Sequence, residues 1–112
     1  MAFPDALLTR GFVVPINFTA GGAGDTTVRA AVTGRGWVIT YLHLECSASI
    51  DLLFKSGTTA LTGVIAITGT QVYDFEASGA PILKSSASGE AFVINCSGAA
   101  DVDGWAYMME TV

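Results

Sequence analysis

Residues 37–55 read WVITYLHLECSASIDLLFK and predict two β-strands, joined by a corner of small residues at 47–49. Strand side chains alternate between two faces. In the first strand, one face carries Val38, Thr40, Leu42, Leu44 and Cys46. The other face carries Trp37, Ile39, Tyr41, His43 and Glu45. Because neither face is plainly polar, this strand is either buried on both sides or presents an apolar surface to a partner.

Toward the N-terminus, apolar residues alternate with other residues from Phe12 to Phe18, which predicts a first strand. Pro15 removes one backbone donor and therefore favours an edge strand. The run AGGAGD at residues 20–25 predicts a flexible connection. We assign residues 1–24 to an N-terminal arm and first edge strand, and residues 10–112 to a β-sandwich domain. Four apolar residues are expected to let the arm dock on another surface: Phe3, Pro4, Leu7 and Leu8.

Toward the C-terminus, short alternating segments predict strands at 61–67, 72–75, 89–96 and 105–112, with loops at 76–88 and 97–103. In the last strand, Trp105 and Tyr107 share one face, Ala106 and Met108 share the other, and the pattern does not settle which face lies inward. No helical periodicity is present. The prediction is an all-β fold: a single antiparallel β-sandwich of about eight short strands, jelly-roll-like.

Composition sets limits on function. The 112 residues are 51% hydrophobic and only 13% charged, whereas a typical soluble domain is about 25% charged. Such a surface is expected to be covered in part by other subunits of a homo-oligomer. The net charge of −5 disfavours a nucleic-acid partner. No signal-peptide pattern and no apolar run of membrane-spanning length occurs, so we expect no membrane partner and synthesis in a cytoplasm.

Candidate chemistry is sparse. Cys46 and Cys96 are predicted to face inward, either as two buried free thiols or as a disulfide; a cytoplasmic origin favours free thiols. His43 has no cysteine or carboxylate at a zinc-ligand spacing and no partner suited to catalysis. Asp101 and Asp103 are expected in a solvated loop, because two carboxylates do not complete a calcium shell. The sequence therefore predicts no enzyme, no metal and no cofactor.

The second face of the central strand is the main clue to function. Trp37, Ile39, Tyr41 and His43 form either a second buried layer or a contact between identical subunits. We favour the subunit interface, because low charge and exposed aromatic residues are typical of such interfaces.

Two blocks carry a resemblance to a known kind of protein: LLFKSGTTALTG at residues 52–63 and SSASGEAFVINCSGAADVDGWAYMMETV at residues 85–112. Together they resemble a small β-sandwich virion domain of tailed bacteriophages. The resemblance implies a capsid decoration or cement protein, commonly trimeric, bound to the major capsid protein on the outside of the virion. Residues 1–24 have no counterpart in it, so the capsid-contacting arm is our own inference. The alternative is a tail or fibre module that binds a host-surface glycan through residues 76–88 and 97–103.

Overall fold

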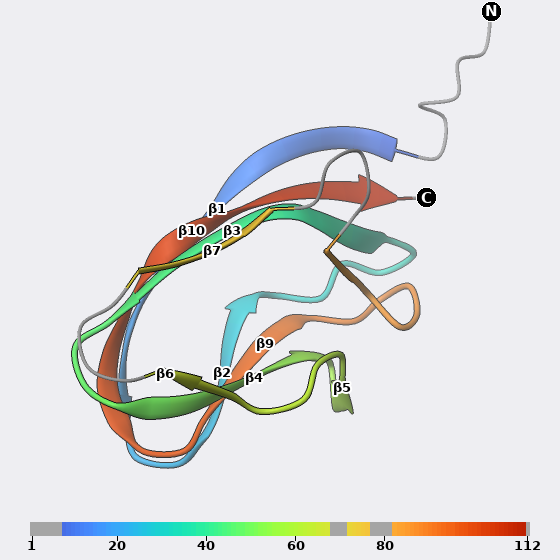
Figure 1. The fold of residues 1–112 in the computed structure, drawn as a ribbon. Helices are drawn as coiled ribbons and strands as arrows, with labels where there is room; N and C mark the ends of the chain where they lie inside the picture. Colours follow the sequence, from blue (N-terminus) through green and yellow to red (C-terminus); the bar gives the residue numbers. More distant parts are fainter. Residues whose placement is uncertain (1–7, 68–71, 77–81, 112) are drawn as a thin grey trace, which may run out of the picture.

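The computed structural model describes residues 8–67, 72–76 and 82–111, and it confirms the predicted β-sandwich. Two antiparallel sheets pack face to face (Figure 1). Sheet A has the order β1 (Leu8–Gly21), β10 (Ala99–Thr111), β3 (Gly36–Cys46) and β7 (Val72–Glu76), with β8 (Leu83–Lys84) also paired to β3. Sheet B has the order β2 (Gly24–Arg29), β9 (Phe92–Cys96), β4 (Ile50–Ser56) and β5 (Thr59–Ala60), with β6 (Ile65–Ile67) also paired to β4.

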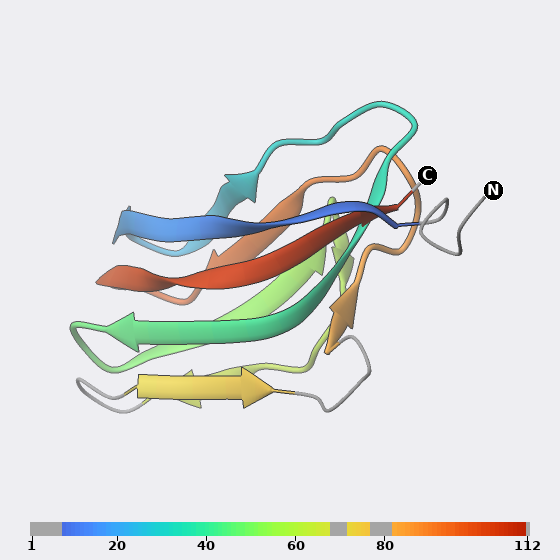
Figure 2. The same cartoon turned by 90° about the horizontal axis from the view of Figure 1, so that it is seen from above.

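The strand order is that of a jelly roll. Strands β1, β3 and β9 each continue through a corner into β2, β4 and β10 of the other sheet. Strand β7 follows β6 in the same alternation, and neighbours in one sheet are followed by neighbours in the other. Eight strands wound in this way give the double-sheet arrangement of jelly rolls. The corners after β1, β3 and β9 lie together at one end, whereas the start of β1 and the end of β10 lie at the other (Figures 1 and 2).

Two serines hold the corner end together. Ser47, after β3, donates its backbone N–H to the Asp101 carbonyl (3.0 Å), and its hydroxyl accepts the Asp101 N–H (2.8 Å). Ser97, after β9, makes the same reciprocal pair with Asp51, at 3.0 and 2.9 Å. Backbone groups that would lose their ladder partners at a bend are thereby satisfied. The small residues predicted to turn the chain at 47–49 do so.

The first strand lies at a sheet edge, which confirms the prediction made from Pro15. Among the described strands, β1 pairs only with β10, and Pro15 stands opposite Trp105 in that pairing. The predicted connection at 20–25 is shorter than expected, because β1 extends to Gly21 and β2 begins at Gly24. The predicted loop at 97–103 is also corrected: β10 begins at Ala99, so Asp101 and Asp103 are strand residues.

The predicted faces of the central strand are wrong for its first half. Ile39 of β3 stands opposite Met108 and Tyr41 stands opposite Tyr107, so Thr40 is an extra residue at a β-bulge. One extra residue exchanges the two faces of a strand. Trp37 and Ile39 therefore point into the sandwich, at 1% and 0% exposure, whereas Tyr41, after the bulge, keeps the outward face as predicted.

The core lies between the sheets and explains why Trp37 is inside. Its ring packs against Phe92 of sheet B, with ring centroids 5.2 Å apart. Its indole N–H donates to the Glu90 carbonyl at 2.9 Å, so the buried polar atom has a partner. Ala106 and Met108 are fully buried, which settles the orientation of the last strand: Trp105 and Tyr107 point outward.

Candidate interaction surface

The outer face of sheet A carries a group of exposed and half-buried apolar and aromatic side chains from three adjacent strands. Two cross-strand rows form it: Val13, Tyr107 and Tyr41 in one, and Pro15, Trp105 and His43 in the other. Val13, Trp105 and Tyr107 are 56%, 39% and 38% exposed, which is unusual for large apolar side chains. We call these six residues the aromatic face.

The rings of this face are stacked on one another. Trp105 lies 4.7 Å from Tyr41 between ring centroids, at an interplanar angle of 18°. His43 lies on Trp105 at 6.1 Å and 14°. Stacked rings restrict one another's rotation, so these side chains are held in one arrangement before any partner arrives.

Two glycines make room for this arrangement. Gly104 has φ of +146°, and a Cβ placed there would lie 1.9 Å from the His43 carbonyl oxygen. The backbones of β10 and β3 therefore approach closely beside Trp105, and only glycine permits this. A Cβ at Gly11 would lie 2.3 Å from the Tyr107 hydroxyl oxygen, so the Tyr107 ring lies over Gly11.

A row of hydrogen-bond acceptors borders the aromatic face on the side of the corners. Asn17, Asp103 and Glu45 stand opposite one another on β1, β10 and β3, two residues along from Pro15, Trp105 and His43. Asp103 and Glu45 are exposed. One step further, Asp101 accepts a hydrogen bond from the Thr19 hydroxyl at 2.7 Å. We call Asn17, Asp103, Glu45 and Asp101 the acceptor row.

The predicted interface residues are therefore only partly together. Tyr41 and His43 belong to the aromatic face, whereas Trp37 and Ile39 are core residues and cannot contact another subunit. Sequence reasoning did not assign Val13, Pro15, Trp105 and Tyr107 to this surface. Two features of the sequence could have indicated these residues. The first strand was predicted at a sheet edge, and the last strand carried Trp105 and Tyr107 on a face whose orientation was undecided.

Of the predicted capsid-contacting residues, only Leu8 is described. It begins β1 and pairs through its backbone with Thr111, so it belongs to the sheet and not to an arm. Phe3, Pro4 and Leu7 lie outside the described residues.

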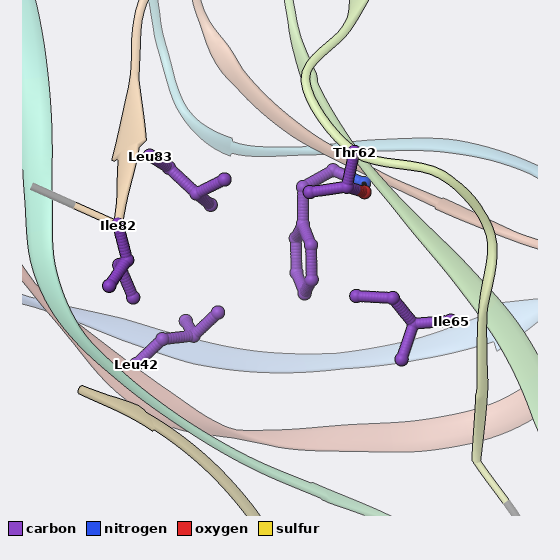
Figure 3. Close-up of a pocket in the computed structure, with 6 residues that line it drawn as sticks. Leu42, Thr62, Ile65, Ile82 and Leu83 are labelled. Atoms are coloured by element: carbon purple, nitrogen blue, oxygen red, sulfur yellow. Dashed lines mark hydrogen bonds between the residues drawn. The ribbon is translucent and has the colours of Figure 1, made fainter. Parts of the chain in front are cut away.

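One small cavity opens between the sheets (Figure 3). Its volume is about 100 Å³, and its lining is almost wholly apolar: Leu42, Phe54, Thr62, Ile65, Ile82 and Leu83. The single polar side chain, Thr62, donates to the Gly63 carbonyl at 2.8 Å and accepts the Phe54 N–H at 3.3 Å. This volume is smaller than that of an apolar cavity of about 150 Å³ that holds benzene, and the cavity brings no reactive group to its interior.

The two cysteines are buried free thiols, as predicted. Burial raises the pKa of Cys46 to about 11, with smaller contributions from nearby Cys96 and Asp103. Burial also raises the pKa of Cys96. Since the thiolate is the reactive form, neither residue is suited to nucleophilic chemistry near neutral pH. Within residues 8–67, 72–76 and 82–111, no three potential metal ligands converge.

Comparison of the chain with protein-family models, with curated protein sequences and with solved structures found no match. In the described part of the chain, no helix has the length and apolar character required to span a membrane. The site is thus defined by its geometry alone: an aromatic face of stacked rings with carboxylates along one border.

Proposed function

We propose that this protein is a structural virion protein that decorates the outside of a tailed-phage head as a homo-oligomer and acts by contact, without chemistry. The observation that carries the proposal is the aromatic face, because large exposed apolar side chains held rigidly on a sheet mark a contact surface. The resemblance of residues 52–63 and 85–112 to small virion domains supports the same function. Jelly rolls are frequent in viral capsid domains, although a fold alone does not assign a function.

The mechanism would be stabilisation by mass action. A protein that binds only the assembled shell adds its binding free energy to the stability of that shell. The predicted capsid contacts Phe3, Pro4 and Leu7 precede Leu8, where β1 starts beside the end of β10. This end is opposite the corners (Figure 1). In this arrangement the head is bound at the terminal end, and the outer face of sheet A remains available to a second partner.

The test is the addition of the purified protein to heads that lack it. We expect many copies to bind over the whole head, detected by gold labelling and gel densitometry, and the heads to resist higher temperatures. A variant without residues 1–7 should keep the fold by circular dichroism and lose head binding. Absence of binding by the intact protein would contradict the proposal.

A second candidate is a tail or fibre module that binds a host-surface glycan. The acceptor row beside the stacked rings favours it, because carboxylates next to an aromatic surface suit a ligand rich in hydroxyl groups. Copy number separates the two candidates. Few copies at a single vertex of the particle would identify a fibre domain, and many copies over the head would identify a decoration protein.

A further inference from the structure

We infer that the aromatic face and the acceptor row together form a binding site for a short neutral oligosaccharide. The inference rests on the proposed function in one respect only, namely that the outer face of sheet A is a contact surface. It names the partner of that surface. The size of the face, the chemistry of its two rows and its charge carry the argument.

The size of the face fits a small ligand better than a protein. Adjacent strands lie about 4.8 Å apart and residues two apart along a strand are separated by about 7 Å, so the six side chains cover roughly 200 Å². A stable protein interface buries about 800 Å² on each partner. Six side chains alone do not supply that area, and carboxylates border them on the corner side.

The aromatic face matches one side of a sugar ring. A pyranose presents C–H groups on its faces and hydroxyl groups around its edge. The π face of an aromatic ring is electronegative and attracts such C–H groups. Trp105 is 39% exposed, and its ring is already stacked with Tyr41 and His43, so little side-chain entropy is lost on binding.

The acceptor row matches the edge of the same sugar ring. Asp103 precedes Trp105 by two residues on β10, and Glu45 pairs with Asp103 on the neighbouring strand β3. Residues two apart on a strand are separated by about 7 Å, so both carboxylates border the stacked rings. Sugar hydroxyls would donate to these carboxylates, and hydrogen bonds to an ionised acceptor are about twice as strong as neutral ones. Asn17 adds an amide that both donates and accepts at the edge of β1.

Charge selects among saccharides. The face is bordered by the carboxylates of Glu45, Asp101 and Asp103, and the chain carries a net charge of −5. Sialylated or sulfated glycans would meet like charges there.

The test uses isothermal titration calorimetry of the full-length protein with cellotriose, maltotriose, mannotriose and chitotriose, and with 3′-sialyllactose as the anionic comparison. We expect at least one neutral trisaccharide to bind and sialyllactose not to bind. Trp105→Ala should weaken that binding by about tenfold or more, because the stacking surface is lost. Asp103→Asn should weaken it by several-fold while leaving the fold and the ring stack in place.

Val64→Ala is the matched control, because Val64 is 65% exposed and belongs to the connection between β5 and β6, outside sheet A. It should bind the trisaccharide as the wild type does. The inference is overturned if no neutral saccharide binds, or if Trp105→Ala binds as well as the wild type. It is also overturned if Trp105→Ala lowers the oligomer mass in light scattering while no saccharide binds, since the face would then be a subunit interface. Head binding is measured separately, so loss of saccharide binding with retained head binding contradicts this inference and leaves the proposed function intact.

Discussion

Arg29 of β2 and Glu110 of β10 form an ion pair that joins the two sheets at the end opposite the corners. Their side chains are only 16% and 7% exposed. The Arg29 guanidinium also lies 5.0 Å from the centre of the Phe12 ring, so it contacts two strands of sheet A. The corners and their serine hydrogen bonds join the sheets at one end. At this end, the ion pair adds a side-chain contact to the chain connections at 30–35 and 85–91.

Glu110→Ala should therefore destabilise the fold strongly, because it leaves a largely buried guanidinium without its carboxylate partner. We expect a loss of about 2–4 kcal/mol in the free energy of unfolding, measured by urea denaturation. Replacing both residues by methionine should recover most of the loss, since no charge is then left buried. A change below about 0.5 kcal/mol for Glu110→Ala would show that the pair contributes nothing to stability.

Gly104→Ala on β10 should destabilise the fold strongly. A Cβ at this position would lie 1.9 Å from the His43 carbonyl oxygen, and the backbone φ of +146° is unfavourable for alanine. We expect destabilisation of about 3 kcal/mol or more in thermal or urea unfolding. Gly98→Ala is the control, because nothing lies within 4 Å of its Cβ position, and it should change stability little.

The two thiols should be unreactive in the native protein. Burial raises the pKa of both, to about 11 for Cys46, so the thiolate is scarce at pH 8 and is shielded from reagents. We expect Ellman's reagent to label neither thiol before unfolding and both after addition of denaturant. Rapid labelling of the folded protein would contradict the burial of these residues in the core.

Stability should fall in acid because of two hydrogen-bonded carboxylates. Asp25 accepts from Asn95 at 2.6 Å and from Lys55 at 2.9 Å, which lowers its pKa. Hydrogen bonds from Ser56 and Ser86 lower the pKa of Glu90. A carboxyl group with a pKa lower in the folded state stabilises the fold above its unfolded-state pKa, and this stabilisation is lost as the pH falls through the folded-state pKa.

The lowered pKa values of Asp25 and Glu90 set the pH range over which stability should change. Unfolded carboxyl groups titrate near pH 4, so the melting temperature should hold above about pH 5 and fall progressively below about pH 4. Asp25→Asn combined with Glu90→Gln should flatten this fall in a series of melting curves from pH 7 to pH 2. If the double variant follows the wild-type curve, other groups govern acid stability.

Much of the fold was predictable from the sequence, because its signals are local. Alternating side chains identified the strands, Pro15 identified an edge, and the small residues at 47–49 identified a corner. Cys46 and Cys96 were correctly placed inward, since the alternation of their strands runs without interruption to the corner end. These features depend on neighbours in the chain and not on the partner strand.

The candidate site was only half predictable, because it depends on a bulge that has no local signal. Thr40 is an ordinary strand residue, and its role as an extra residue follows only from pairing with Met108 and Tyr107. Counting alternate residues through Thr40 assigned Trp37 and Ile39 to the wrong face. The orientation of Trp105 was undecidable for a related reason, since both faces of the last strand are apolar until its partner strands are known.

The central structural claim is that Trp37 lies in the core, whereas Trp105 lies on the outer face beside Tyr41, which follows the Thr40 bulge. Acrylamide quenching of tryptophan fluorescence tests this division directly. The chain has two tryptophans, Trp37 at 1% exposure and Trp105 at 39%. In Trp37→Phe, only Trp105 remains, and its fluorescence should be quenched strongly; in Trp105→Phe, only Trp37 remains, and quenching should be weak until the protein unfolds. Equal quenching of the two variants, with both folded by circular dichroism, would contradict the division between core and aromatic face.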